Sequence, residues 1–334
     1  VDALTAELKA ASSEEMALKV FKKHARLMDD FQNEATHISV LFTLASDNPT
    51  YAKDMNKLDE GMPLVQTADI AFQKAMLDSP YRAYLEKKLG SFLFQMYEYS
   101  LKSFDERIVE EAVEENKLST KYSSTVAAFK VSFRGNEYNI FQMGKFLQDQ
   151  DRATRKEASA AYYATLSSHE DELEAIYDDL VHVRDKMAKK LGFKNYVELA
   201  YLRMNRFDYD AKAVEGYRDE IHDVVTPLAG KLLKAQFKRA GIKKPEIYDL
   251  SIFYKDGNPM PEGSTEEKFE KAKWMYDEMS EDTSFFFRYL ADHHVLDLEA
   301  RPGKQGGGYM TYFPKYGIPF IFSNFNGTRG DVDV

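Results

Sequence analysis

Three long segments without glycine or proline constrain the fold more than any other feature of this chain. They are residues 1–48, 91–134 and 145–191. Glycine and proline are the residues that most often interrupt helices, so segments of this length can form helices of several turns. By contrast, seven of the 17 glycines fall within residues 301–334. The sequence therefore predicts a mainly α protein whose last part is built differently.

The clearest predicted helix covers residues 168–191. Its apolar side chains recur every three or four residues, its first turns are acidic and its last turns are basic, which suits the helix dipole. Gly192 follows and can take the left-handed conformation that ends many helices. A second helix is expected after Asp210, with a kink at Pro227, and a third from the capping box at Ser264. The second helix carries one apolar face: Val214, Tyr217, Ile221, Val224, Leu228 and Leu232.

Few segments show the alternating pattern of strands, and these form two candidate hairpins. Residues 129–133 and 138–140 alternate around a short polar turn. Residues 309–313 and 320–325 are short, aromatic and joined by a turn that contains two prolines. The sequence thus predicts a small amount of antiparallel sheet in a helical protein.

The distribution of glycine and proline along the chain suggests two domains. A break in the pattern near residues 142–150 separates an amino-terminal helical lobe, residues 1–145, from the first part of a second domain, residues 146–334. The first hairpin belongs to the amino-terminal lobe. We find no internal repeat and no low-complexity linker.

Composition excludes several classes of function. A formal net charge of −10 and a pI of about 5.4 oppose binding to nucleic acid, which requires a basic surface. The chain has no cysteine, so it has no disulfide, thiolate metal site or cysteine nucleophile, and this fits a cytoplasmic protein. No apolar stretch is long enough to cross a membrane. The start lacks both an initiator methionine and a signal-peptide pattern, so we expect that Val1 is not the natural first residue.

The residues that could carry chemistry form no catalytic motif. Two histidines four residues apart on one helix are the usual zinc pair, and no such pair occurs. His169-Glu170 begins like this motif, but position 173 is Leu, and His293-His294 would point in different directions. Paired carboxylates such as Glu110-Glu111 are typical of solvated helix faces. Neither a serine-hydrolase elbow nor a P-loop is present.

The most distinctive block runs from Gly306 to Tyr312 and continues from Ile318 to Thr328. One interpretation is a hairpin in the core. The other is a peptide site, because glycines let a backbone approach closely and a short strand can pair with an extended peptide. From these residues alone, the core hairpin is the favoured interpretation. A phosphate loop is disfavoured because no helix follows the three glycines.

This block resembles a segment of a known enzyme family. Gly-Gly-Gly-Tyr, then Pro-Phe-Ile-Phe-Ser-Asn-Phe-Asn-Gly-Thr, then Gly-Asp-Val-Asp-Val is similar to the sequence that precedes the zinc helix of oligoendopeptidase F and thimet oligopeptidase-like zinc metallopeptidases, including the PZ-peptidase branch. Residues 155–163, 189–199 and 203–206 resemble the same family, as does the hairpin near 129–140. The similarity covers about residues 115–334.

The resemblance implies a large helical ellipsoid with a deep cleft and a small antiparallel sheet. Residues 146–334 would be the first part of its catalytic domain. In the family, a His-Glu-x-x-His helix and a downstream Glu hold zinc and activate water. We expect this chain to stop before that motif, with Asp331 capping the helix that carries it, and therefore to contain no catalytic or metal-binding residue and to be inactive alone. A complementary carboxy-terminal part would then be a partner.

The resemblance also places a peptide-binding segment in this chain. Its predicted residues are Gly307, Gly308, Tyr309, Phe322, Ser323, Asn324 and Phe325. The expected substrates are short, unstructured peptides, with zinc as the cofactor of the parent enzyme and no nucleic-acid or membrane partner. Two alternatives stay open: a non-catalytic helical module that binds peptides or acts as a scaffold, and a helical domain without a site. An interrupted fold should also expose apolar surface and associate with itself.

Overall fold

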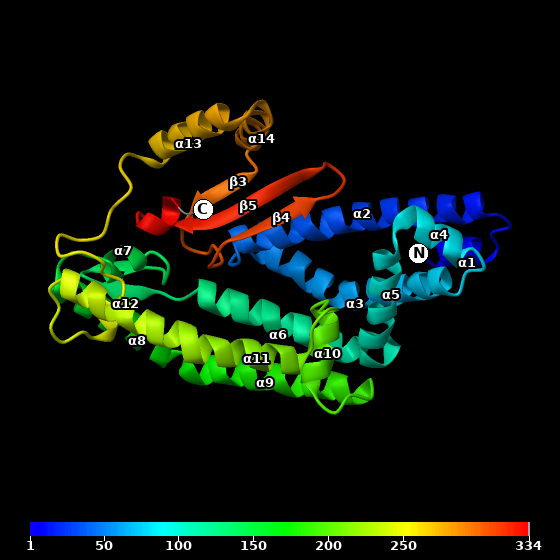
Figure 1. The fold of residues 1–334 in the computed structure, drawn as a ribbon, viewed down its shortest axis with the longest axis horizontal. Helices are drawn as coiled ribbons and strands as arrows, with labels where there is room; N and C mark the ends of the chain where they lie inside the picture. The colour runs from blue at the N-terminus through cyan, green and yellow to red at the C-terminus, as the bar shows by residue number, and fades with distance from the viewer. Residues whose placement is uncertain (333–334) are drawn as a thin grey trace. The chain divides into compact units, whose positions relative to one another are not determined.

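The structure is a computed structural model that describes residues 1–332, and helices dominate it (Figure 1). The chain divides into two compact units. The first unit comprises Val1–Phe42, Pro49–Tyr122 and Glu172–Arg218, and the second comprises Thr43–Asn48, Ser123–Asp171 and Asp219–Val334. Each unit is therefore assembled from segments that are distant in sequence. The domain boundary between residues 145 and 146 stays a prediction.

The regular elements of the first unit are all helices. Its residues belong to α1 (Asp2–Lys9), α2 (Glu14–Leu44), α3 (Pro49–Leu77), α4 (Arg82–Leu89), α5 (Ser91–Ser103), a 3-10 turn (Glu106–Ile108), α6 (Val109–Ala127), α9 (Glu170–Lys190), α10 (Tyr196–Arg203) and α11 (Ala211–Glu220). The last residues of α2, α6 and α11 and the first of α9 belong to the second unit. The helix predicted at 168–191 is confirmed as α9, and Gly192 has the left-handed φ of 90°.

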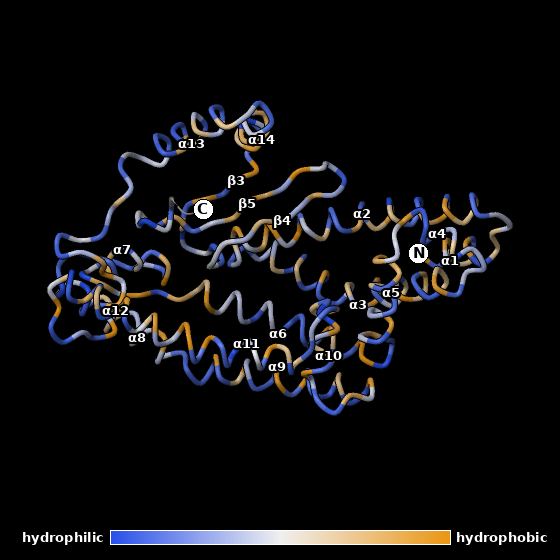
Figure 2. Tube along the Cα trace, viewed as in Figure 1, coloured by the Kyte–Doolittle hydropathy of each residue, from blue (hydrophilic) through white to orange (hydrophobic). Residues whose placement is uncertain are grey.

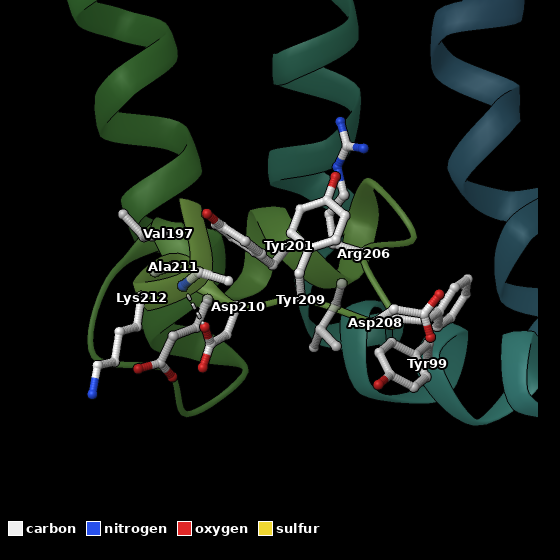
Figure 3. Close-up of a pocket in the computed structure, with 13 residues that line it drawn as sticks. Tyr99, Val197, Tyr201, Arg206, Asp208, Tyr209, Asp210, Ala211 and Lys212 are labelled. Carbon is white, nitrogen blue, oxygen red and sulfur yellow. Dashed lines mark hydrogen bonds between the residues drawn. The ribbon is translucent and has the colours of Figure 1, made fainter. Parts of the chain in front are cut away.

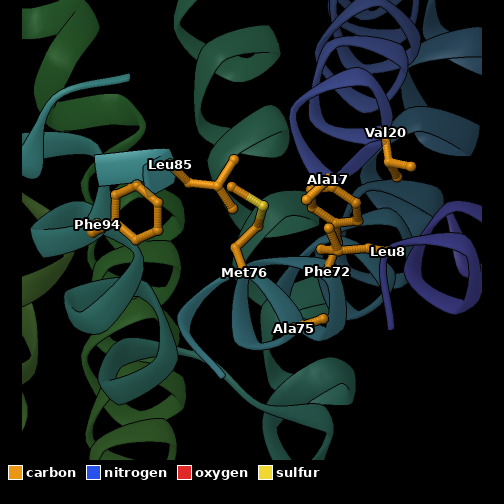
Figure 4. Packing of buried hydrophobic residues seen from close by; sticks show 8 residues of the cluster. All are labelled: Leu8, Ala17, Val20, Phe72, Ala75, Met76, Leu85 and Phe94. Atoms are coloured by element: carbon orange, nitrogen blue, oxygen red, sulfur yellow. The ribbon is translucent and has the colours of Figure 1, made fainter. Parts of the chain in front are cut away.

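Two apolar clusters form the core of the first unit. The larger one gathers side chains of α1 to α5 and is drawn in Figure 4: Leu8, Ala17, Val20, Phe72, Ala75, Met76, Leu85 and Phe94. The other packs α6 against α9 and α10 and includes Ala112, Met187 and Leu199. Beside it, the buried carboxylate of Glu115 receives hydrogen bonds from Arg184 and Arg203. Burial raises the pKa of Glu115, but the two guanidinium groups outweigh burial, so the pKa is lowered.

The second unit combines helices with two small sheets. Its elements are β1 (Val131–Phe133), β2 (Asn136–Tyr138), α7 (Gly144–Leu147), α8 (Arg152–Ser168), a π-helical turn (Ile221–Val225), α12 (Thr226–Arg239), a 3-10 turn (Ile247–Asp249), α13 (Thr265–Met279), α14 (Glu281–Asp292), β3 (Leu296–Glu299), β4 (Tyr309–Phe313), β5 (Ile318–Phe325) and a 3-10 turn (Arg329–Val332). The predicted first hairpin is confirmed, but its second strand runs from Asn136 to Tyr138 and not from residue 138 to 140. Its turn is correspondingly shorter, and Arg134 and Gly135 both have positive φ there.

The sequence around Pro227 is accommodated by the π-helical turn. The N–H of Thr226 bonds to the carbonyl of Ile221, five residues earlier. A proline ring clashes with the carbonyl four residues before it in a regular α-helix, and a π turn widens the backbone at that point. Hydrophobic and hydrophilic residues alternate along α11 and α12 (Figure 2). The apolar face is exposed: Val224, Leu228 and Leu232 are 65%, 53% and 63% exposed.

Two arginines and one aspartate fix the start of α8. Asp249 is buried, with no exposed side-chain surface, and Arg152 and Arg155 each bind its carboxylate. Arg155 also donates to the carbonyls of Asp149, Gln150 and Tyr248. Burial opposes ionisation of Asp249, but the hydrogen bonds that its carboxylate accepts from Arg152 and Arg155 outweigh burial and lower its pKa to about 2. The pair therefore ties the 3-10 turn at 247–249 to α8.

The three-stranded sheet contains the block that the sequence singled out. The predicted pairing of residues 309–313 with 320–325 is confirmed as antiparallel β4 and β5, although β5 begins at Ile318. β3 joins the other side of β5 in parallel, which the sequence did not indicate. The strand order is β3-β5-β4, so β5 is central. Among residues 1–332, no helix is both long and apolar enough to cross a membrane.

Candidate functional site

The seven predicted peptide-binding residues lie together at one end of the three-stranded sheet, but their exposure differs. Gly307 and Gly308 are exposed in the loop that enters β4. Phe322 and Ser323 on β5 are only 1% and 6% exposed. Because β5 pairs with a strand on each side, its backbone groups opposite these strands are already used. Within the described residues, the unpaired edges of this sheet belong to β3 and β4.

The edge of β4 is the one that combines access with exposed side chains. Met310 and Tyr312 are 66% and 51% exposed, whereas the alternating residues Tyr309, Thr311 and Phe313 are partly buried. An extended peptide binds such an edge through main-chain hydrogen bonds, while alternate side chains give specificity. The geometry can therefore hold a peptide along β4, with β5 as the support behind it.

The glycine loop before β4 is packed tightly on one side. A Cβ added at Gly306 would lie 1.6 Å from Cζ of Phe141, so the phenyl ring lies directly against this glycine. Gly307 has no neighbour within 4 Å of such a Cβ, but its φ of 85° favours glycine. The two glycines are thus needed for different reasons, close packing at Gly306 and backbone conformation at Gly307.

The segment Thr43–Asn48 also holds this loop. The backbone N–H of Gln305 donates to the Thr43 carbonyl over 2.8 Å. The backbone N–H and the side-chain hydroxyl of Ser46 both donate to the Gly303 carbonyl, at 2.8 and 2.9 Å. These contacts join residues more than 250 positions apart in the chain. Sequence reasoning missed them because nothing in the local pattern marks a long-range contact.

Tyr309 connects this segment to the sheet. Its ring stacks on Phe322 with centroids 4.6 Å apart, and its hydroxyl lies 2.5 Å from the Thr43 hydroxyl. Burial raises the pKa of Tyr309, and the hydrogen bond with Thr43 opposes that rise. Tyr309 was predicted to touch a peptide, yet in this structure its hydroxyl is engaged within the protein.

Asn324 and three charged residues complete the site. The Asn324 Nδ2 donates to the carbonyls of Gln305 and Gly307, at 2.9 and 2.7 Å, and its buried Oδ1 has no partner among the described residues. On β3, Asp297 pairs with Arg301. Burial raises the pKa of Asp297, but hydrogen bonds from Arg301 and Lys304 outweigh burial and lower it. Sequence reasoning missed Lys304, although a lysine two residues before three glycines was the available signal.

A separate pocket lies in the first unit (Figure 3). Its volume is about 790 Å³, and it is lined by aromatic residues around one guanidinium, including Tyr99, Tyr201, Phe207, Tyr209 and Arg206. Figure 3 shows Arg206 beside Tyr209, and the guanidinium lies 5.5 Å from the centre of that ring. None of the predicted site residues lines this pocket. Its acidic and basic groups are mixed, so it shows no clear preference for a charged ligand.

The described residues do not fit a zinc site. Within residues 1–332, no three His, Cys, Asp or Glu side chains come together in a way that could hold a metal ion. No metal-dependent step can therefore be assigned to the side chains of residues 1–332.

Comparison with known proteins gives the family. Residues 145–334 match peptidase family M3, and residues 1–104 match the peptidase M3 N-terminal domain. The chain therefore belongs to peptidase family M3. Its mainly α fold and the resemblance to oligoendopeptidase F are confirmed by this match and by solved structures.

Two of these structures are similar over almost the whole chain. A Bacillus anthracis str. Ames protein assigned as an oligoendopeptidase F is 39% identical, with a TM-score of 0.97 over 99% of this chain and 61% of its own. PZ peptidase A, solved with an inhibitor, is also 39% identical, with a TM-score of 0.98 over 99% of this chain and 59% of its own. This chain thus spans about three fifths of the length of these proteins.

A more distant structure, a Chlamydophila abortus protein assigned as a peptidase, shares the fold at 15% identity and a TM-score of 0.54. No curated protein sequence matches the chain.

Proposed function

We propose that this chain forms the substrate-binding side of a zinc-dependent endo-oligopeptidase that hydrolyses short, unstructured peptides in the cytoplasm. The observation that carries the proposal is the open edge of β4 beside the exposed Gly307 and Gly308, in a chain of peptidase family M3. A peptide pairs with β4 in an extended conformation. Phe322 pairs with Tyr309 at the start of β4, and Asn324 holds the glycine loop that leads into this strand. An extended bound conformation excludes folded substrates, because their backbone groups are already paired.

Hydrolysis needs groups that the described residues do not provide. Bound zinc supplies a water of lowered pKa and polarises the scissile carbonyl. Since no metal-binding group forms within residues 1–332, we propose that the zinc ligands and the general base belong to a complementary carboxy-terminal part. The chain alone is then inactive, and its own residues bind and orient the peptide.

Exposed apolar side chains on the second unit support the proposal of a complementary carboxy-terminal part. Leu232 on α12, Trp274 on α13 and Phe285 on α14 are 63%, 63% and 70% exposed. Large exposed apolar side chains are candidates for contact with another protein surface. In isolation these surfaces should make the chain self-associate, which size-exclusion chromatography measures.

A chimera tests the proposal. Joining this chain to the carboxy-terminal part of PZ peptidase A that it does not cover should give an enzyme that cleaves a quenched fluorescent peptide and loses activity with a chelator. The same chain without that part should bind the peptide but leave it intact. A well-folded chimera that binds zinc and cleaves nothing would refute the enzymatic proposal. Peptide binding in that case would favour the alternative of a non-catalytic binding module.

A further inference from the structure

Lys304 places a charged ammonium group in the interior of the second unit. The residue is 1% exposed and its side chain not at all. Its Nζ lies 2.7 Å from Oδ1 of Asp297, 3.1 and 2.9 Å from the carbonyls of Asp297 and Glu299, and within bonding distance of the Ser323 carbonyl. It also lies 4.4 Å from the ring centre of Phe322. An ammonium has three protons, so these four oxygens fully satisfy it.

The acceptors surround an irregularity in the sheet. Asp297 pairs with Phe322 and Glu299 pairs with Phe325, so β3 advances by two residues where β5 advances by three. A bulge of this kind interrupts the ladder of backbone hydrogen bonds and leaves carbonyls to be satisfied in another way. The carbonyls of Asp297, Glu299 and Ser323 flank the bulge, and the Lys304 ammonium satisfies them. The buried ammonium is therefore hydrogen-bonded to both strands at the bulge.

Asn324 connects the bulge to the glycine loop. Asn324 lies within the extra length of β5, and its Nδ2 reaches the carbonyls of Gln305 and Gly307 in the glycine loop. The Asn324 side chain therefore links the glycine loop to β5 at the bulge. Lys304 belongs to the same loop, one residue before Gln305. The loop and β5 are thus joined in both directions: the Lys304 ammonium of the loop donates to the Ser323 carbonyl of β5, and the Asn324 amide of β5 donates to carbonyls of the loop.

We propose that Lys304 is a positioning residue for peptide binding: its ammonium fixes the bulge at Ser323–Asn324, and through Asn324 it fixes the glycine loop that enters the edge strand β4. The inference rests on the proposed function, because it assigns a role in that site. Burial lowers the pKa of Lys304, and the hydrogen bond with Asp297 opposes this, but Lys304 acts in its charged form because it donates to four oxygens. Lys304 does not touch the peptide.

A double-mutant cycle on the intact chain tests the inference. The probe is a fluorescein-labelled alanine peptide of about six residues, the length of an ordinary strand, with a lysine at each end. Anisotropy should show that Lys304→Met and Asn324→Ala each weaken binding about tenfold. The double variant should also lose about tenfold, because both changes break one connection, whereas independent effects would multiply to about a hundredfold. Lys271→Met, on the exposed face of α13, removes the same charge and should bind like the wild type.

Hydrogen exchange gives a second measurement that does not need the peptide. Amides of residues 305–308 should exchange faster in Lys304→Met and in Asn324→Ala, while amides of α8 stay as protected as in the wild type. Lys304→Gln keeps part of the hydrogen bonding and should be intermediate in both assays, so it serves if Lys304→Met does not fold.

The outcomes separate the two proposals. If the wild type does not bind the peptide, the proposed function fails, and the exchange pattern alone decides the role of Lys304. If the wild type binds and Lys304→Met binds within about twofold of it, or if the two single effects multiply, the inference is wrong. Faster exchange spread over the whole second unit would also overturn it, because Lys304 would then serve only general stability.

Discussion

The buried carboxylate of Asp249 allows a prediction whose magnitude follows from the structure. Two guanidinium groups hold it, and Arg155 has only 3% of its side chain exposed. Asp249→Asn keeps the shape of the side chain but removes the charge, so it leaves a buried arginine without its counter-ion. Breaking a buried pair in this way costs about 3–5 kcal/mol of unfolding free energy. Arg152 is half exposed and adds little, which favours the lower end of that range.

The pH dependence gives an independent check on the same group. The pKa is lowered from 3.8 to about 2, which corresponds to about 2 kcal/mol of stability from ionisation. Because the folded-state pKa is the lower one, this contribution is complete above about pH 5. It is lost as the pH falls through 3.8 toward 2, with about half gone near pH 3. Asp249→Asn cannot lose it, so the stability gap between wild type and variant should narrow by about 1 kcal/mol between neutral pH and about pH 3.

Urea unfolding followed by circular dichroism at both pH values measures this gap. Asp256→Asn is the matched control, since Asp256 is exposed in the same unit and should change stability by less than about 0.5 kcal/mol. The reasoning would be refuted if Asp249→Asn cost no more than Asp256→Asn at neutral pH. A gap that stays constant down to about pH 3 would show that the carboxylate pKa is not lowered in the folded state.

Three further substitutions test the packing of the site and of the first unit. Gly306→Ala would place a methyl group against a phenyl ring and should cost about 1–3 kcal/mol by urea unfolding, whereas Gly230→Ala in α12 meets open space and should stabilise by up to about 1 kcal/mol. Equal effects would contradict the close contact. Tyr309→Phe keeps the stacked ring but loses the hydroxyl contact, so thermal unfolding should show a loss of about 1 kcal/mol and no larger one. Glu115→Gln removes the charge between two arginines and should cost about 1–3 kcal/mol. No measurable cost would show that solvent screens this pair.

Local patterns in the sequence predicted the elements whose bonds are local. The helix α9 follows from its periodicity and from Gly192, and the pairing of β4 with β5 follows from two short aromatic runs around a turn. β3 was not predicted, because a parallel strand pairs with a partner that is distant in sequence and has no hairpin turn to mark it. The contact between Gly306 and Phe141 is hidden for the same reason.

The apolar face of α11 and α12 shows a different limit of sequence reasoning. The periodicity correctly predicted one apolar face, but Val224, Leu228 and Leu232 are exposed in the structure. Amphipathic spacing predicts that the apolar face of a helix is covered, but it does not identify the surface that covers it. The spacing of histidines has a similar limit, because it can identify a zinc pair only when both ligands lie on one helix.

From the sequence, the glycine block had two interpretations, a core hairpin and a peptide site, and we propose that different residues of the block serve each. Phe322 and Ser323 are buried on a strand paired on both sides, as a core hairpin requires. Gly307 and Gly308 are exposed beside an edge strand, as peptide pairing requires. A peptide edge must be rigid before binding, because ordering a loop would otherwise reduce affinity. In the proposed site, the buried strand and the Lys304 ammonium would provide this rigidity, so burial of the hairpin would be a condition for peptide binding and not an alternative to it.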